Sequence, residues 1–230
     1  MIALFNEILF KPLFNATVFL YNILPGSDFG LAIIVLTILI RIVFLPLTAK
    51  TIRSQKALSE INPKVQEIKE KYKGDKTAQS AAILQLYKEN NVNPLSGCFP
   101  LLIQIPILIA LYQAFIAGFE PESLNFLYAF IENPGQINKI SLGFIDISSS
   151  SPVLAVLAAT TQFFQMKTTT KMMQSSMSSN KQAEALNKQM LYFFPVIIII
   201  IGWNLPAGLM FYWITTTIVS TMEQIYLRKK

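Results

Sequence analysis

Arg41 is the only charged residue in the apolar segment Phe29–Leu47, which is 19 residues long. A helix needs roughly 20 apolar residues to cross the hydrocarbon core of a bilayer, so this segment is predicted to span a membrane. Arg41 would then lie near mid-depth, where an arginine costs roughly 3 kcal/mol on insertion scales. Such a residue normally faces a watery cavity or a partner. The sequence therefore predicts a polar cavity around Arg41; the alternative is an arginine whose long side chain reaches the nearer membrane surface.

The residues that could act on or beside Arg41 are few. No aspartate or glutamate lies near its depth in any predicted span, so its counter-ion is expected to be water or a visiting substrate, and Glu223 is expected at the membrane interface. The chain has no histidine and one cysteine, Cys98, which excludes disulfides within the chain and a Cys/His metal site. Paired aspartates, a Ser/His pair and glycine-rich phosphate loops are also missing. We therefore expect no enzyme, no cofactor and no metal.

The composition places these residues in an all-α integral membrane protein, because 53% of the chain is hydrophobic and only 14% is charged, against about 25% in soluble domains. Apolar runs and turn signals predict five transmembrane helices, at residues 29–49, 98–119, 152–170, 190–203 and 209–227. The remaining segments are an interfacial helix broken near Pro12 with a turn (1–28), an external loop (120–151), a cytoplasmic loop (171–189), an external turn (204–208) and a cytoplasmic tail (228–230). A sixth span near the N-terminus is the alternative.

The longest polar segment, 50–97, is predicted to be a cytoplasmic helical hairpin. Its first helix carries apolar residues at alternating spacings of three and four, namely Leu58, Ile61, Val65, Ile68 and Tyr72. Gly74 and Asp75 end that helix, and a second is expected from about Thr77 to Asn90. Because patterned helix of this length is unusual in a mere connection, an interaction arm is favoured over a solvated spacer.

The basic residues are gathered in three segments. Sixteen of the nineteen lysines and arginines lie in the hairpin, in 167–189 or in the last three residues. By the positive-inside rule these segments are cytoplasmic and the N-terminus lies outside. This sidedness explains the basic composition without a DNA-binding domain, although ribosomal RNA remains a candidate contact for the inner face.

Three stretches resemble the YidC membrane protein insertase family, which has mitochondrial and thylakoid relatives: TILIRIVFLPLTAKTIRSQKALSEINPKVQEI, YKENNVNPLSGCFPLLIQIPILIALYQAF and NLPAGLMFYWITTTIVS. The resemblance covers about 29–227. It implies a five-span core with a hydrophilic groove that is open to the cytoplasm and to lipid and closed outside. Arg41 would be the central charge of the groove, with Thr37 one turn before it.

The resemblance also implies groove residues on two other spans. These are Gln162, with Gln165 one turn away as the alternative, and Trp213. Helical spacing adds Thr217 on the face of Trp213 and Tyr212 on the adjacent face.

The function implied is that of an insertase or chaperone in a bacterial plasma membrane. Its expected partners are nascent membrane proteins, the ribosome, the Sec translocon and membrane lipids, with no DNA and no small-molecule substrate. Contact with the ribosome would come from the hairpin or from 167–189. A small-solute transporter or channel that uses the same cavity is the alternative, but the chain shows none of the internal repeats common in transporters.

Overall fold

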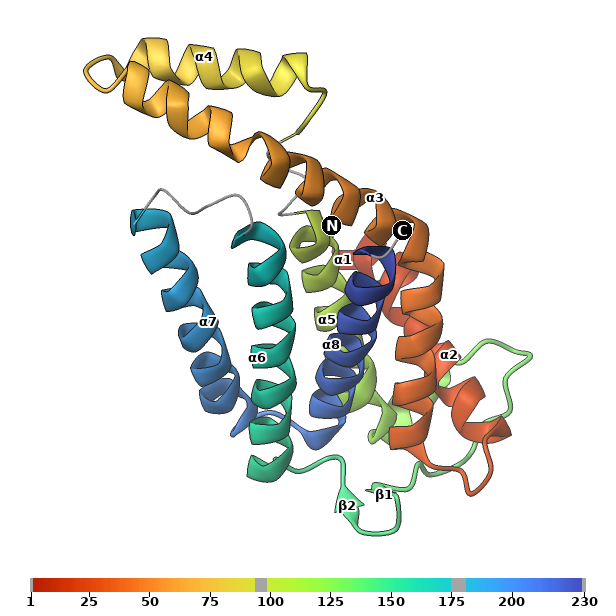
Figure 1. Ribbon diagram of the computed structural model, residues 1–230. Helices are drawn as coiled ribbons and strands as arrows, with labels where there is room; N and C mark the ends of the chain where they lie inside the picture. Colours follow the sequence, from red (N-terminus) through yellow and green to blue (C-terminus); the bar gives the residue numbers. More distant parts are fainter. Residues whose placement is uncertain (1, 94–98, 175–180, 229–230) are drawn as a thin grey trace.

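The computed structural model describes residues 2–93, 99–174 and 181–228 and is mostly helical, with helices packed side by side into a bundle from which a hairpin projects (Figure 1). In chain order the α-helices are α1 (Ile2–Phe5), α2 (Lys11–Ile23), α3 (Phe29–Lys71), α4 (Lys76–Glu89), α5 (Phe99–Gly118), α6 (Pro152–Gln174), α7 (Lys181–Gly202) and α8 (Ala207–Arg228). The π-helical turn η1 (Asn6–Phe10) joins α1 to α2, and the 3-10 helix η3 (Pro121–Phe126) follows α5. Strands β1 (Ile140–Ser141) and β2 (Ile145–Asp146) pair antiparallel, with Ile140 opposite Asp146.

Helix α3 is 43 residues long and carries both the apolar segment around Arg41 and the first arm of the hairpin. At 1.5 Å per residue it extends about 65 Å, twice the thickness of a hydrocarbon core. Pro46 and Pro63 lie inside it without ending it. Proline bends a helix rather than stopping it when both halves are held by packing, and α3 changes direction between the bundle and the hairpin (Figure 1).

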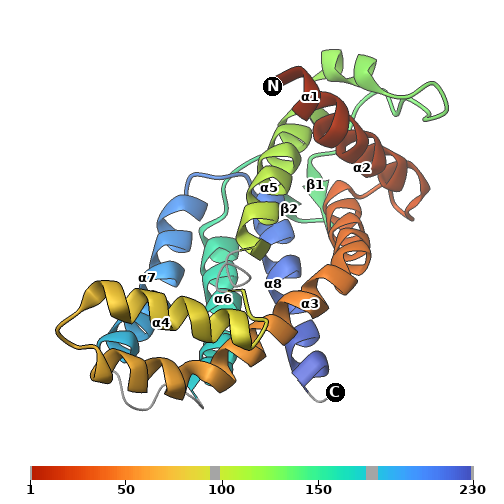
Figure 2. The ribbon, with the colours of Figure 1, turned by 90° about the horizontal axis from the view of Figure 1, so that it is seen from above.

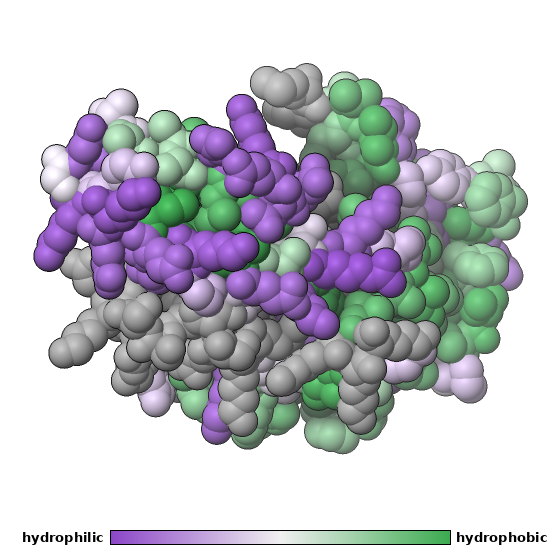
Figure 3. Space-filling view, turned by 45° about the horizontal axis from the view of Figure 1, so that its top comes forward, coloured by the Kyte–Doolittle hydropathy of each residue, from purple (hydrophilic) through white to green (hydrophobic). Residues whose placement is uncertain are grey.

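The hairpin of α3 and α4 has the turn that the sequence predicts. The Asp75 side chain caps α4 by accepting hydrogen bonds from the backbone N–H groups of Thr77 and Ala78, at 3.0 and 2.9 Å. Two residues of the predicted stripe, Ile61 and Val65, are buried on α3, as is Leu86 on α4. Seen from above, the arms lie over the end of the bundle where α6 ends and α7 begins (Figure 2). Hydrophilic side chains cover them, whereas the flank of the bundle is hydrophobic (Figure 3).

The N-terminal segment differs from the prediction of a break near Pro12. Residues 2–23 are helical without interruption, and Pro12 follows the π-helical turn η1 at the start of α2. A proline inside a helix removes one hydrogen bond and crowds the preceding turn, and the wider turn accommodates it. The polar residues of this segment also have structural roles: Asn15, which is 1% exposed, accepts from the N–H of Tyr128 at 2.6 Å and donates to the carbonyl of Phe126 at 3.1 Å.

Two parts of the predicted loop 171–189 are helical: residues 171–174 belong to α6 and residues 181–189 to α7, while 175–180 lie outside the described residues. α6 continues to Gln174, and α7 begins at Lys181, nine residues before the start expected from hydropathy. Hydropathy marks where the apolar environment ends, not where the helical hydrogen bonds end, and the added residues (KQAEALNKQ) are mostly good helix formers. The two short β-strands were not predicted, because two residues cannot show an alternating pattern.

Length and hydropathy single out two stretches of the described chain as long enough to cross a membrane, Ala3–Ile23 and Phe29–Lys71. Two further helical stretches are apolar but shorter, Gln104–Gly118 and Leu191–Gly202. The N-terminal stretch thus keeps the alternative of a sixth span open.

The best-packed part of the bundle lies at the end opposite the hairpin. The large side chains buried there come from α2, α5, the connection before α6 and the first turns of α3 and α8; they are Phe14, Phe29, Leu111, Ile147 and Met210. Asp28 caps α3 and also binds the connection: it accepts from the hydroxyl of Ser141 at 2.5 Å and from the N–H of Leu142 at 2.6 Å. Partial burial acts to raise the pKa of Asp28, but these hydrogen bonds outweigh it and lower the pKa below its ordinary value.

Candidate functional site

A cavity of about 50 Å³ lies between α3, α5 and α8, large enough for a few water molecules. Its lining comprises Thr37, Ile40, Arg41, Phe44, Leu47, Thr48 and Thr51 of α3, Gln104 and Ile107 of α5, and Tyr212 and Thr216 of α8. The α3 residues recur every three or four positions, which places them on one face of the helix. Among the described residues that line the cavity, Arg41 alone is charged, and six others carry hydroxyl or amide groups.

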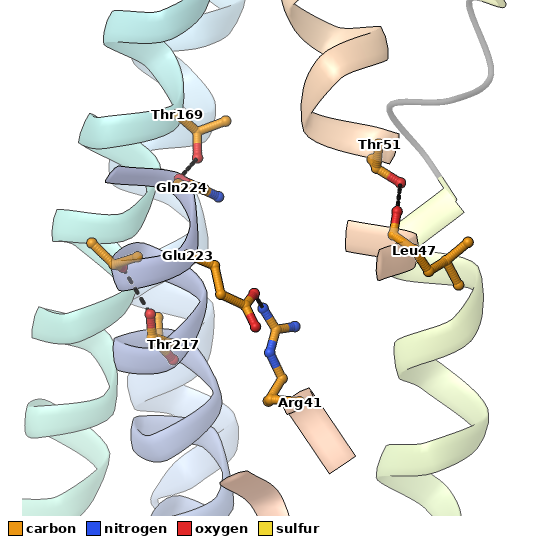
Figure 4. A network of polar contacts seen from close by, with 8 residues as sticks. Arg41, Leu47, Thr51, Thr169, Thr217, Glu223 and Gln224 are labelled. Atoms are coloured by element: carbon orange, nitrogen blue, oxygen red, sulfur yellow. Dashed lines mark hydrogen bonds and ion pairs between the residues drawn. The ribbon is translucent and has the colours of Figure 1, made fainter. Parts of the chain in front are cut away.

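The partner of Arg41 is Glu223 of α8. The Nη2 group of Arg41 donates to Oε2 of Glu223, and the two side chains are only 14% and 8% exposed (Figure 4). This corrects the expectation that the counter-ion of Arg41 is water or a visiting substrate, because Arg41 has a resident counter-ion and Glu223 is buried against it.

The sequence contained part of the signal for this pair. Glu223 lies eleven residues after Tyr212, which is close to three helical turns and therefore on the cavity face of α8. Arg41 is twelve residues from the start of α3, whereas Glu223 is sixteen from the start of α8. The difference of four residues is about 6 Å along the helix axis, a distance that an extended arginine side chain spans. Relative depth of two helices is not encoded in the spacing on either helix, so the pair could not be predicted.

Arg41 keeps hydrogen-bonding capacity beyond Glu223. A guanidinium carries five N–H donors, and the Nε group of Arg41 is buried with no partner within the described chain. A buried donor left unpaired costs about 1–3 kcal/mol, which favours water or an acceptor group of a ligand beside it. No three metal-binding side chains gather among the described residues. The chemistry of the cavity is thus that of a cation paired with one carboxylate, with amide and hydroxyl groups beside it.

Four of the neutral polar side chains that line the cavity are hydrogen-bonded within the protein, whereas the Thr216 hydroxyl is buried with no partner within the described chain. Gln104 donates to the Tyr212 hydroxyl and so links α5 to α8. Thr37 and Thr51 donate to carbonyls one turn back on α3, at 2.6 and 3.2 Å. Gln113, nine residues after Gln104 on α5 and therefore on the opposite face, is exposed.

The other predicted site residues lie on the far side of α8, between α8 and α6. Nε1 of Trp213 donates to Oε1 of Gln162 at 3.0 Å, and Nε2 of Gln162 donates to Oε1 of Gln165 at 2.9 Å. Thr217 is buried and donates to the backbone carbonyl of Trp213. We call these four residues the α6–α8 seam. None of them lines the Arg41 cavity, so the structure separates the predicted set into two groups.

A further polar link joins the same helices nearer the hairpin. Thr169 of α6 donates to the side-chain oxygen of Gln224 of α8 at 3.0 Å (Figure 4). Gln224 directly follows Glu223 in the sequence, and the two side chains leave α8 in different directions (Figure 4). Adjacent residues of one helix therefore face α6 and Arg41.

The sequence profile of the family described as "60Kd inner membrane protein" matches residues 19–230. Among curated proteins, the "Membrane protein insertase YidC" of Fusobacterium nucleatum is 34% identical over 214 residues, which are 89% of this chain and 88% of that protein. The chain belongs to the YidC family. The YidC protein of Geotalea daltonii is 33% identical over 219 residues, 95% of this chain but 37% of its own length. The chain thus spans little more than a third of several curated YidC relatives that it matches.

Comparison with solved structures agrees with this family assignment. A crystal structure titled "Active YidC insertase crystal structure with the first transmembrane domain resolved" matches 95% of this chain and 45% of that one, with a TM-score of 0.61 and 24% sequence identity. At this identity the match shows a shared fold. The helical bundle that positions Arg41 is therefore the YidC fold.

Proposed function

We propose that this YidC-family chain is a membrane protein insertase, which moves segments of newly made membrane proteins from the cytoplasm into the bilayer. The observation that carries the proposal is the Arg41 cavity, a small polar space with one cation on an otherwise apolar stretch of α3. The names of the relatives support it, since those from Fusobacterium and Geotalea are called insertases. Catalysis of a covalent reaction is not part of the proposal.

The proposed topology has five spans, formed by the first half of α3 and by α5, α6, α7 and α8. The hairpin, the segment between α6 and α7 and the C-terminal residues face the cytoplasm, and the N-terminal segment and 120–151 lie outside. The concentration of lysine and arginine in the first three segments supports this orientation. Nascent chains, and beside them the ribosome and the Sec translocon, are the proposed partners on the basic face.

The physical step follows from the geometry. A polar cavity inside the bilayer shortens the apolar barrier that a hydrophilic end of a client must cross, and a cation in a region of low dielectric attracts acidic groups in that end. The apolar segment of the client passes along α6 and α8, whose outward side chains such as Phe164 and Met222 are more than half exposed. Burial of about 20 apolar residues in lipid drives the transfer without a nucleotide.

The predicted site residues take two roles in this proposal. Thr37, Arg41 and Tyr212 receive the polar end in the cavity. The seam residues Gln162, Gln165, Trp213 and Thr217 keep α6 against α8, so that the apolar segment meets a continuous surface. Gln104 joins the cavity group because it positions Tyr212.

The test is insertion by the purified full chain in lipid vesicles. A model client with one span and a short translocated end is synthesised in vitro in their presence, and insertion is scored by protection of that end from added protease. We expect protection well above that in protein-free vesicles. Protection equal to that background, together with leakage of a small solute through the chain, would favour a transporter or channel instead.

A further inference from the structure

The Arg41–Glu223 pair serves no step of the proposed function, because that function needs a cation that is available to clients. We infer that Glu223 is a resident competitor for Arg41: it occupies the guanidinium between clients, and an acidic group of a client must displace it. Glu223 would then determine how acidic a translocated end has to be. This inference rests on the proposed insertase function.

The geometry of the pair permits such an exchange. Glu223 contacts one terminal nitrogen of Arg41, while Nε has no partner within the described chain. A second carboxylate can therefore bind the guanidinium before the first one leaves. A buried guanidinium without a counter-ion is high in free energy. An exchange in which the second carboxylate binds before the first leaves avoids that state.

The position of Glu223 suits a competitor at the entry side. It lies five residues before Arg228, the last residue of α8, and farther along its helix than Arg41 is along α3. The carboxylate is thus nearer the hairpin end of the bundle, which is the proposed cytoplasmic side. A client that enters from there meets a neutral pair and not a free cation.

The inference implies that the efficiency of insertion depends on the charge of the client's translocated end. With Glu223 present, a client with one acid only replaces one carboxylate by another, and a neutral client leaves the pair in place. Without Glu223 the cavity carries an uncompensated cation. The Glu223→Gln variant should then raise insertion of a one-acid client, relative to a neutral client, by about fivefold, which corresponds to about 1 kcal/mol, because no resident ion pair has to be broken.

The experiment uses the full chain in vesicles and two readouts. The first is the rate at which phenylglyoxal modifies Arg41, measured by mass spectrometry relative to Arg53, which is exposed on the hairpin. The second is insertion of clients with zero, one or two acids in the translocated end. The variants are Glu223→Gln and Glu223→Asp, with Glu7→Gln as matched control, because Glu7 forms an exposed ion pair with Lys11 far from the cavity.

We expect phenylglyoxal to modify Arg41 faster in Glu223→Gln than in the parent, and insertion to increase for acidic clients only. Glu223→Asp, which keeps the charge on a shorter side chain, should give an intermediate result. Glu7→Gln should change neither readout. Unchanged Arg41 modification in both Glu223 variants, or faster modification without a selective gain, would overturn it. If the parent protein inserts no client above protein-free vesicles, the proposed function itself fails; faster Arg41 modification in Glu223→Gln would then still report the ion pair, so the two failures are distinct.

Discussion

The two sides of α8 are both polar, yet they differ in how their polar groups are paired. On the α6 side, Trp213 and Gln162 are neutral groups that bond directly across the helices. On the α3 side, Arg41 lines a cavity, shares one bond with Glu223 and has a buried donor, Nε, that is unpaired within the described chain. The comparison teaches that polar residues in membrane helices have to be sorted by their partners: a satisfied pair stabilises packing, whereas a partly satisfied cation can bind something else.

The largest effect is expected from removing the cation. Arg41→Ala should lower insertion of clients with acidic translocated ends by about tenfold, equivalent to 1.4 kcal/mol, and affect neutral clients less. Arg41→Lys should retain much of the activity, because the cavity needs a cation more than a fork of donors. The measurement is the vesicle insertion assay with clients of zero, one and two acids.

This variant needs a control, because Arg41→Ala leaves Glu223 buried without its partner. The double variant Arg41→Ala/Glu223→Gln removes both charges and should show the same loss for acidic clients. If the double variant inserts acidic clients as well as the parent, the loss came from the stranded carboxylate and not from the missing cation.

A smaller effect is expected at the seam. Trp213→Phe and Gln162→Leu each remove one side of a hydrogen bond, and interhelical bonds of this kind contribute about 0.6–1.7 kcal/mol in membranes. We therefore expect a modest loss of stability in detergent unfolding, a coupling energy of about 1 kcal/mol in the double-mutant cycle, and the same dependence on client acidity as in the parent. A change in that dependence would show that the seam shares the role of the cavity.

Three of the residues that line the cavity could be named from the sequence. Arg41 is the single charge in an apolar run, Thr37 one turn before it is implied by the family resemblance, and helical spacing places Tyr212 on the face next to that of Trp213. What could not be predicted depends on how helices are placed against one another. The depth of Glu223 relative to Arg41 is one case, and the division of the predicted residues between two sides of α8 is another.

The positions where helices begin and end show the same difference: some are set by nearby residues, and others depend on packing against distant parts of the chain. The hairpin turn at Gly74 and Asp75 is encoded locally and was predicted. The unbroken course of α3 through Pro46 and of the N-terminal helices through Pro12 depends on packing along both halves, which the local pattern does not contain. Likewise the contact that Asn15 makes with the connection after η3 joins residues more than 100 positions apart, which the local pattern cannot show.

The most direct test of the account is to locate the two parts of a client during insertion. In a Cys98→Ser background, one cysteine is placed in the cavity (Thr48→Cys) or in the seam (Gln165→Cys), and a ribosome-bound client carries one cysteine in its polar leading end or in the middle of its apolar segment. The account predicts that the leading end forms a disulfide with the cavity position and the apolar segment with the seam position. Equal crosslinking of both parts to both positions, or the reverse pairing, would contradict the division of roles between the two sides of α8.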